Sequence, residues 1–219
     1  MIQKNRFFLR RPFEYQYSRR TLFIILVNVL IFFSRYLFPD LYYYIYKLCG
    51  MNPQNVFYGH MYWEFVTYMF LHSNPSHLLY NMLGLLVFGL SVERKIGSRE
   101  FTLFYFFCGI FSGLLSFAVY YLTGQMNVLL IGASGAIYAV LFAYAVFFPR
   151  SIIMIWGLIP VPAPILVIIY ILIELFSQLR GGSNIAHMTH LFGFLGAWLY
   201  FVLRMGIHPV KIWKETYRR

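Results

Sequence analysis

Long uncharged hydrophobic runs follow one another along this chain. We identify six, at roughly residues 21–38, 75–92, 101–122, 132–148, 163–178 and 186–204. Each run approaches the ~20 residues that a helix needs to cross a bilayer. Helices are the expected form, because irregular backbone and open strands cannot face lipid. The alternating segments of about ten residues that mark an outer-membrane barrel are absent from the sequence. The pattern therefore predicts an all-α polytopic membrane protein with six transmembrane helices.

The composition agrees with this prediction. Of the 219 residues, 60% are hydrophobic and 11% are charged, whereas a soluble domain carries about a quarter charged residues. No internal repeat or low-complexity linker divides the chain, and Cys49 and Cys108 have no metal-binding spacing and are weak evidence for a disulfide. We therefore expect one membrane domain over residues 21–206, between a basic N-terminal segment at 1–20 and a basic tail at 207–219.

The net charge of +11 is distributed unevenly. In a six-span arrangement, 15 of the 18 Lys and Arg residues fall on the side that holds both termini. They are Lys4, Arg6, Arg10, Arg11, Arg19, Arg20, Arg94, Lys95, Arg99, Arg150, Arg204, Lys211, Lys214, Arg218 and Arg219. The other side receives Lys47 and Arg180, and Arg35 lies near the outer end of the first span, where its side chain can reach the interface. This excess places both termini in the cytoplasm. The charge thus indicates topology and contact with anionic lipid rather than nucleic-acid binding.

Two segments between the spans have patterns of their own. Residues 40–63 form a long external loop rich in tyrosine and tryptophan, which favour the membrane interface, so we expect an interfacial anchor. Residues 152–162 are apolar but interrupted by Gly157, Pro160 and Pro162, and proline is not accommodated inside a helix. We expect this segment to lie along the cytoplasmic interface. The first span is too long for the apolar core of a removable signal peptide.

Polar residues recur at one depth on the three spans that run inward from outside. They are His77 with Asn81, Ser134 with Tyr138, and His187 with His190, and each pair shares one helix face. Ser134 lies between Gly132 and Gly135, which allow a sharp turn and close approach of the backbone. The chain is therefore expected to dip into the protein interior and to enter a helix at Ser134. Buried polar groups at membrane depth are costly, so they favour a functional interpretation.

This combination predicts a serine nucleophile with a histidine base. His190 would remove the Ser134 proton, and the backbone N–H of Ser134, together with His77 and Asn81, would stabilise the oxyanion of a tetrahedral intermediate. Tyr138, one helical turn beyond the serine, is the candidate ring for His190 to stack on.

An acidic third member of a triad is not expected. None of the seven acidic residues lies on the fourth or sixth span, and Glu174 on the fifth is expected to be capped or to face the interface, without a role. A Ser–His dyad follows. As a metal site, His187 and His190 are weak, because two histidines three residues apart have no acidic or cysteine ligand nearby. No metal and no cofactor are expected.

Each feature also has a purely structural interpretation. A Gly-x-Ser-Gly segment in a membrane helix is more often a small-residue packing face, and His77 and Asn81 are suited to hydrogen bonding between helices. Gly193 and Gly196 are expected to let the sixth span pack closely on the fourth. The occurrence of these polar groups together, at one depth, favours catalysis.

Four motifs in this order resemble the rhomboid intramembrane serine proteases. They are His77-Leu78-Leu79-Tyr80-Asn81, Glu93-Arg94-Lys95-Ile96-Gly97-Ser98, Gly132-Ala133-Ser134-Gly135 with Tyr138, and His190 with Gly193. Their order and approximate spacing match over about residues 60–200. The resemblance implies a six-helix rhomboid fold with Ser134 as nucleophile and His190 as general base. It also implies His77, Asn81 and the Ser134 N–H as the oxyanion hole. The active site would open to the extracytoplasmic side, and the substrates would be single transmembrane segments cut near small residues.

Two positions depart from the family pattern. Many relatives have Trp-Arg in the first external loop, where this chain has Trp63-Glu64, and this bears on salt bridging in that loop. The glycine often found seven residues after the catalytic histidine is Ala197 here, a small change in packing.

We therefore expect an intramembrane serine endopeptidase of the cytoplasmic membrane that acts on single-pass membrane proteins, inactivated in mild acid when His190 is protonated. No nucleic-acid partner is expected, and the sequence leaves the oligomeric state open. The alternative is a catalytically inactive rhomboid-like protein that binds transmembrane helices in membrane protein quality control, but such a protein needs neither Ser134 nor His190. A channel or transporter would need polar residues along a whole path. The layout, without transit peptide or appended domain, suggests a bacterial protein.

Overall fold

Helices make up most of the computed structural model, which describes residues 13–155, 157–179 and 185–218. Six helical segments correspond to the six hydrophobic runs. They are α1 (Arg20–Leu37), α5 (Pro75–Gly84) continued by η3 (Leu85–Gly89) and α6 (Leu90–Ile96), α7 (Ser98–Leu122), α8 (Ser134–Phe147), α9 (Ala163–Leu179), and α10 (Ile185–Tyr200) continued by η4 (Phe201–Met205). Shorter elements are α2 (Pro39–Cys49), α3 (Pro53–Gly59), α4 (Glu64–Thr67), η2 (Tyr68–Phe70), α11 (Pro209–Tyr217), β1 (Ile152–Ile155) and β2 (Ile159–Pro162).

The lengths of the six segments differ from the prediction in one respect. Among the described residues, four helices are long and apolar enough to cross a membrane: Arg20–Leu37, Pro75–Ile96, Ser98–Leu122 and His187–Met205. The two remaining helices, α8 with 14 residues and α9 with 17, are apolar but shorter. The all-α polytopic membrane fold is confirmed, whereas the expected count of six full-length spans is not. The fourth run is shorter as a helix because residues 132 and 133 belong to the approaching loop.

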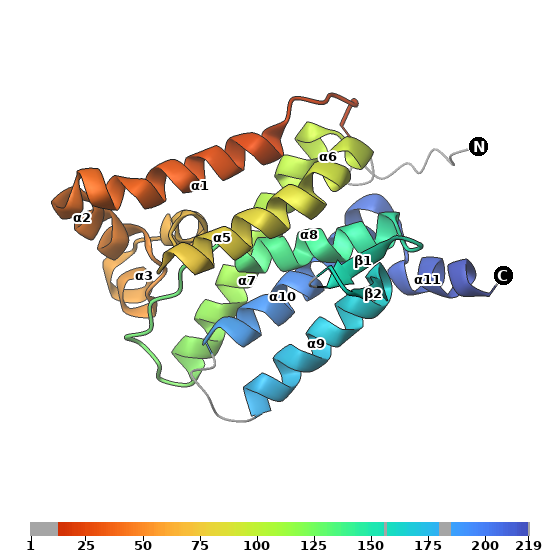
Figure 1. Ribbon diagram of the computed structural model, residues 1–219. Helices are drawn as coiled ribbons and strands as arrows, with labels where there is room; N and C mark the ends of the chain where they lie inside the picture. Colours follow the sequence, from red (N-terminus) through yellow and green to blue (C-terminus); the bar gives the residue numbers. More distant parts are fainter. Residues whose placement is uncertain (1–12, 156, 180–184, 219) are drawn as a thin grey trace.

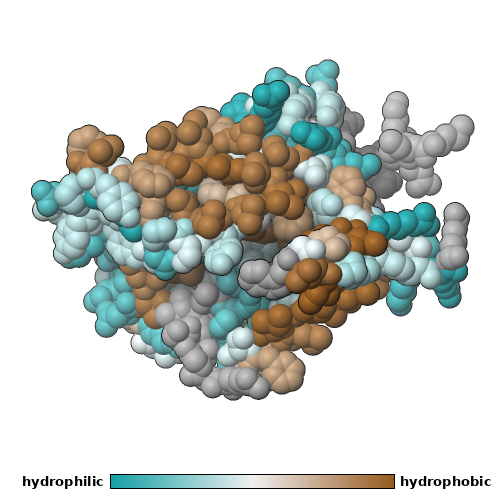
Figure 2. Space-filling view, viewed as in Figure 1, coloured by the Kyte–Doolittle hydropathy of each residue, from teal (hydrophilic) through white to brown (hydrophobic). Residues whose placement is uncertain are grey.

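The helices lie side by side between two polar ends. Figure 1 shows α2 and α3 at one end, and both chain ends, the β1–β2 hairpin and α11 at the other. Between these ends the surface over α1 is hydrophobic (Figure 2), and exposed side chains on its outer face include Leu22, Phe23, Leu26, Leu30 and Phe33. Such a band is the surface that lipid covers, since exposed apolar patches of this size are rare on soluble proteins.

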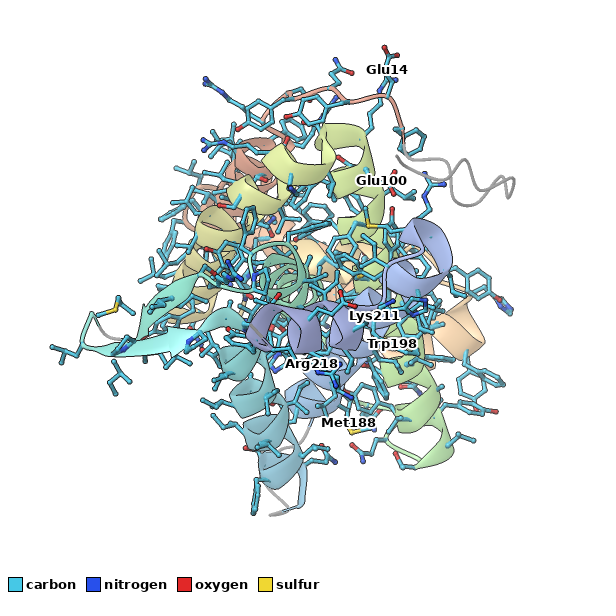
Figure 3. All side chains as sticks on the ribbon, turned by 90° about the vertical axis from the view of Figure 1, so that its right-hand side faces the viewer. Glu14, Glu100, Met188, Trp198, Lys211 and Arg218 are labelled. Atoms are coloured by element: carbon cyan, nitrogen blue, oxygen red, sulfur yellow. The ribbon has the colours of Figure 1, made fainter. Side chains whose placement is uncertain are left out.

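The end that holds both termini carries most of the described basic residues. Figure 3 views the molecule from this end, with Lys211 and Arg218 of the C-terminal segment labelled. The α6–α7 junction with Arg94 and Lys95, and the α8–β1 connection with Arg150, belong to this end as well. Four basic residues of the N-terminal segment, Arg180 and Arg219 lie outside the described residues. The arrangement of the spans thus places the described basic clusters together.

Buried carboxylates tie the helices together at this end. Glu93 of α6 accepts hydrogen bonds from the backbone N–H groups of Arg20 and Thr21, at 2.6 and 2.9 Å, and from the hydroxyls of Thr21 and Ser98. It therefore caps the first turn of α1, whose N–H groups have no intrahelical acceptor. Gly97 has φ +84°, a left-handed conformation that suits glycine, and it allows α7 to begin directly after α6. The Glu93–Ser98 motif thus has a structural role.

The connection after α8 is a β-hairpin, which the sequence analysis did not anticipate. Ile152 pairs with Pro162 and Met154 with Pro160 in antiparallel register. Gly157 adopts φ +70° in the turn. Proline is tolerated here because it can occupy positions in an edge strand that need no N–H donor.

Residues 40–63, which were expected to form an external loop, are more ordered than a loop, since they contain α3 and most of α2. Glu64 is fully buried beside this segment and accepts hydrogen bonds from the Asn52 N–H at 2.8 Å and from Asn55 Nδ2 at 3.0 Å. Burial raises the pKa of the Glu64 carboxyl, and these two hydrogen bonds oppose that shift. Hydrogen bonds to the Glu64 carboxylate therefore hold this segment in place.

Replacement of Glu64 by Ala should destabilise this segment, because it leaves the buried Asn52 N–H without an acceptor. The expected loss is about 1–3 kcal/mol, measured by thermal unfolding of purified protein in detergent. Glu14→Ala, at an exposed acidic position, is the control and should change stability by less than about 0.5 kcal/mol. Equal effects of the two substitutions would contradict this account of Glu64.

Candidate active site

Ser134 occupies the first turn of α8, at the end of a non-helical segment that leads into that helix. Leu130 pairs with Met51 through two backbone hydrogen bonds of 2.8 and 3.0 Å, and the Gly132 N–H donates to the Tyr68 carbonyl at 2.9 Å. Gly132 has φ +118°, a conformation that L side chains rarely adopt. The glycine therefore turns the chain into the helix, and Ser134 lies beneath the external segment.

The Ser134 hydroxyl lies within hydrogen-bond distance of His190. The distance from Ser134 Oγ to His190 Nε2 is 2.8 Å, although the two residues come from different helices. Figure 1 shows α8 between α5 and α10. A Cβ atom at position 193 would lie 2.1 Å from the carbonyl oxygen of Gly135, so only glycine permits this approach of α10 to α8. The absence of a side chain at Gly193 thus sets the distance between serine and imidazole.

Tyr138 and Glu174 both contact the imidazole of His190. The ring of Tyr138 stacks on it, with centroids 4.1 Å apart and planes 7° apart. The Tyr138 hydroxyl donates a 2.6 Å hydrogen bond to Glu174 Oε1, and His190 Nδ1 lies 2.8 Å from the same oxygen. His190 is therefore fixed from its face and from both ring nitrogens.

The expectation that Glu174 is capped or faces the interface is wrong, because the carboxylate contacts the two histidines and Tyr138. It lies on α9, it is buried, and its second oxygen pairs with His187 Nδ1. This acid lies on the fifth span rather than on the fourth or sixth, and α8, α9 and α10 all contact one another. One signal in the sequence pointed to it: Glu174 is the sole charged residue in the run 163–178, and an ionisable residue within a membrane span is by default a functional candidate.

His77 and Asn81 approach the serine from the opposite side, over Gly132. A Cβ atom at position 132 would lie 2.7 Å from His77 Nε2 and 3.9 Å from Asn81 Nδ2. The backbone N–H of Ser73 lies 3.5 Å from His77 Nδ1 and the Ser73 hydroxyl 3.1 Å from it. Since a backbone N–H can only donate, Nδ1 is an acceptor and His77 Nε2 carries the proton. Nε2 is thus a donor on the side facing the turn.

His72 lies behind His77 and is fully buried, with ring centroids 5.0 Å apart. Burial, and after it the nearby His77, lowers the pKa of His72 to about 3. His72 is therefore neutral in the native protein at any pH above this value and adds no charge beside His77.

The donor set of the site bears on metal binding. The ligand atoms of Glu174, His187 and His190 all lie within 4.8 Å of one another. The expectation that the histidine pair has no acid nearby is therefore wrong. In the structure both Nδ1 atoms are engaged by hydrogen bonds to the carboxylate, an arrangement that is complete without an ion.

Comparison with known proteins identifies the family of this chain. The family model described as "Rhomboid domain" matches residues 59–206, more than half of the chain. The chain belongs to the rhomboid family. It is 29% identical over 139 residues to the "Putative rhomboid protease YdcA" of Bacillus subtilis (strain 168), covering 63% of this chain and 64% of that protein.

Other rhomboid relatives come from bacteria and from plant organelles. Identity is 30% over 142 residues to "RHOMBOID-like protein 12, mitochondrial" of Arabidopsis thaliana, covering 58% of this chain and 42% of the relative. It is 28% over 146 residues to "Rhomboid protease AarA" of Providencia stuartii, covering 61% and 52%. The matches thus span less than two thirds of each of these relatives' length.

Two glycines on α10 pack against different helices. Gly193 faces α8 as expected, whereas a Cβ atom at Gly196 would meet Phe111 and Cys108 of α7, so the expectation that Gly196 also packs on the fourth span is wrong. The nearest atom at position 196 is a side-chain carbon of Phe111 at 3.0 Å, and side chains can shift more easily than backbone.

Gly193→Ala should therefore separate α10 from α8, with a loss of stability of at least about 1–3 kcal/mol and loss of the Ser134–His190 contact. Unfolding in detergent measures the first effect, and reaction of Ser134 with a fluorophosphonate measures the second. Gly196→Ala is the matched control and should have the smaller effect on both. A larger effect of Gly196→Ala would contradict the packing assigned to Gly193.

His72 should make the protein less stable in mild acid. Its pKa falls from 6.5 to about 3 on folding, so below pH 6.5 the unfolded chain takes up a proton that the native protein refuses, and stability falls with pH down to about 3. Between pH 7.5 and 5 the loss is about 2 kcal/mol. Unfolding across this range should show a shallower pH dependence for His72→Gln than for the wild type, and parallel curves would refute the assignment.

Proposed function

We propose that this rhomboid protein is an intramembrane serine endopeptidase, with Ser134 as nucleophile and His190 as general base. The 2.8 Å separation of Ser134 Oγ from His190 Nε2 carries the proposal. A nucleophile within hydrogen-bond reach of a base, itself oriented by a third group, is the arrangement that activates serine. Stacking on Tyr138 adds a fixed orientation of the ring.

The reaction uses the two groups in sequence. Ser134 Oγ attacks the scissile carbonyl carbon as its proton moves to His190 Nε2, which then gives that proton to the leaving amine nitrogen as the C–N bond breaks. Water, deprotonated by the same imidazole, hydrolyses the acyl-enzyme and releases Ser134. His77 Nε2, Asn81 Nδ2 and the backbone N–H of Ser134 would bind the oxyanion. The Ser134 N–H suits this task, because the first N–H groups of a helix have no intrahelical acceptor.

Gly132, Gly135 and Gly193 support this machinery by removing side chains from the places where the backbone approaches. The substrates proposed are single-pass membrane proteins whose transmembrane segment unwinds locally, because a helical backbone shields its carbonyl carbons. Helix-weakening and small residues near the cleaved bond follow from this requirement. Lipid is the surrounding partner, and no cofactor is needed.

The proposed location is the cytoplasmic membrane of a bacterium, with both termini in the cytoplasm. The described basic residues at the end with both termini support this orientation. Ser134, at the start of α8, then lies toward the extracytoplasmic side, from which water and substrate would enter.

Ser134→Ala and His190→Gln should each lower kcat by about 10³-fold or more, because each removes a group that acts in the transition state. The measurement is cleavage of a single transmembrane segment by protein reconstituted in liposomes, together with fluorophosphonate labelling of Ser134. Ser151→Ala, in the connection between α8 and β1, should retain wild-type cleavage. Undiminished cleavage by Ser134→Ala would end the proposal, and a wild-type protein that neither cleaves nor reacts would favour the inactive, helix-binding alternative.

A further inference from the structure

Glu174 is a buried carboxylate beside His190 that has no part in the mechanism described for Ser134 and His190. It lies on α9 with 3% of its surface exposed. A carboxylate at membrane depth is strongly disfavoured unless it is paired and hydrogen-bonded. Here its oxygens are contacted by Tyr138 Oη at 2.6 Å, His190 Nδ1 at 2.8 Å, and His187 Nδ1. Three side chains from two other helices thus converge on one carboxylate.

The hydrogen bonds of this cluster define where the protons lie. An ionised carboxylate can only accept hydrogen bonds, so Tyr138 donates its hydroxyl hydrogen and the Nδ1 atom of each histidine carries a hydrogen. A neutral imidazole has a single N–H, so His190 Nε2 has a free lone pair. This is the nitrogen that lies 2.8 Å from Ser134 Oγ. The contact with Glu174 therefore selects the tautomer of His190 that can accept the serine proton.

The same carboxylate is placed to respond to charge. When the Ser134 O–H bond breaks and the Nε2–H bond forms, His190 becomes an imidazolium beside Glu174 Oε1. An ionised partner at 2.8 Å stabilises that positive charge without taking the proton. His187 binds the other oxygen, Oε2, and so fixes the plane of the carboxylate. The cluster does more than hold α9 in place, because it puts a negative carboxylate next to the ring that becomes positively charged during proton transfer.

We propose that Glu174 is the positioning residue of the proposed peptidase: it holds His190 in the Nδ1-protonated tautomer and stabilises the imidazolium. This inference rests on the proposed function of Ser134 and His190. It extends that function from a dyad to a Ser–His–Glu triad whose acid is contributed by the fifth span.

A metal ion at the same three residues would have the opposite consequence. An ion bound by the Nδ1 atoms of His187 and His190 leaves the hydrogen of a neutral imidazole on Nε2. His190 Nε2 could not then accept the Ser134 proton. Metal binding and the proposed role of Glu174 therefore exclude each other, which makes the metal content of the active protein informative.

Glu174→Gln tests the proposal, because glutamine keeps the size of the side chain but removes its charge and offers an N–H₂ donor to one of the imidazoles. We expect kcat to fall by about 10²–10⁴-fold, with KM within about threefold of the wild type. Glu174→Asp should recover part of the lost kcat, since it restores the charge at a greater distance. Ser177→Ala, one turn further along α9, is the matched control and should retain wild-type kcat and KM.

A second measurement separates positioning from mere support of the fold. In protein labelled with ¹⁵N-histidine and carrying Ser134→Ala, NMR reports which nitrogen of His190 bears hydrogen, and His190→Gln identifies its signals. We expect Nδ1–H with Glu174 present, and loss of this single tautomer with Glu174→Gln, while thermal unfolding shows both proteins folded. An unchanged tautomer, a kcat within threefold of the wild type, or activity that requires added Zn²⁺ would each overturn the proposal.

The two proposals fail separately. The NMR measurement needs no catalysis. If Glu174→Gln changes the tautomer of His190 but the wild-type protein cleaves nothing, the contact between Glu174 and His190 is supported and the peptidase is rejected. Cleavage that depends on Ser134 and is insensitive to Glu174→Gln would leave the peptidase and reject the role of Glu174.

Discussion

The approach of α10 to α8 is the contact on which the site depends. Within a bilayer, helices gain little from hydrophobic association with one another, so close packing and hydrogen bonds between helices decide their arrangement. At Gly193 the backbone of α10 comes so near to Gly135 that a single added carbon would meet the carbonyl oxygen. Three contacts of His190 depend on this approach. Ser134 Oγ lies within hydrogen-bond distance of Nε2, Tyr138 stacks on the ring, and Glu174 of α9 contacts Nδ1.

The same physical constraint explains how the chain keeps charge in a lipid environment. Each buried carboxylate is surrounded by donors: Glu93 by the start of α1, Glu100 by Tyr200 and Arg204, Glu64 by two asparagines, and Glu174 by the active-site cluster. The first two bind helices together at the end that holds the termini, where Glu100 is labelled in Figure 3. At the other end, Arg35 joins α1 to neighbouring segments, because its guanidinium donates hydrogen bonds to the Tyr42 hydroxyl and to the carbonyl of His72. Glu174 differs from these, because its donors are the residues that would carry out chemistry.

The sequence predicted the helices well, because lipid imposes the same requirement on every residue of a span. The starts and ends of the hydrophobic runs agree with the helices within a few residues over most of the chain. Polar residues in an apolar run were equally visible, which is why Ser134, His190 and Tyr138 could be named. The hairpin at β1 and β2 was not predicted, since strands of four residues are too short for a periodic signal and the second contains two prolines.

The sequence marks Glu174 as the sole charged residue of its run, but it does not give the rotation of α9 about its axis and so does not show which helix the carboxylate faces. Spacing places residues on one face of their own helix, as for His187 and His190, but it says nothing about which neighbouring helix that face meets. An acid was expected on the fourth or sixth span if at all, whereas the carboxylate that contacts His190 lies on the fifth. The same limit explains Gly196, whose position on α10 was correct and whose partner was α7 rather than α8.

The short length of α8 gives the site its depth. Fourteen residues of helix rise about 21 Å, compared with about 30 Å for the hydrocarbon core. If Phe147 lies at one boundary, next to the exposed Arg150, then Ser134 lies about 9 Å inside the other.

A full-length helix would bring its first turn to the surface, where water competes for every donor. A buried first turn keeps its N–H groups unpaired within the protein, yet close enough to the outside for water to enter. The backbone leading to Ser134 is non-helical at this depth, which is allowed because Met51 and Tyr68 accept or donate its hydrogen bonds and shield it from lipid.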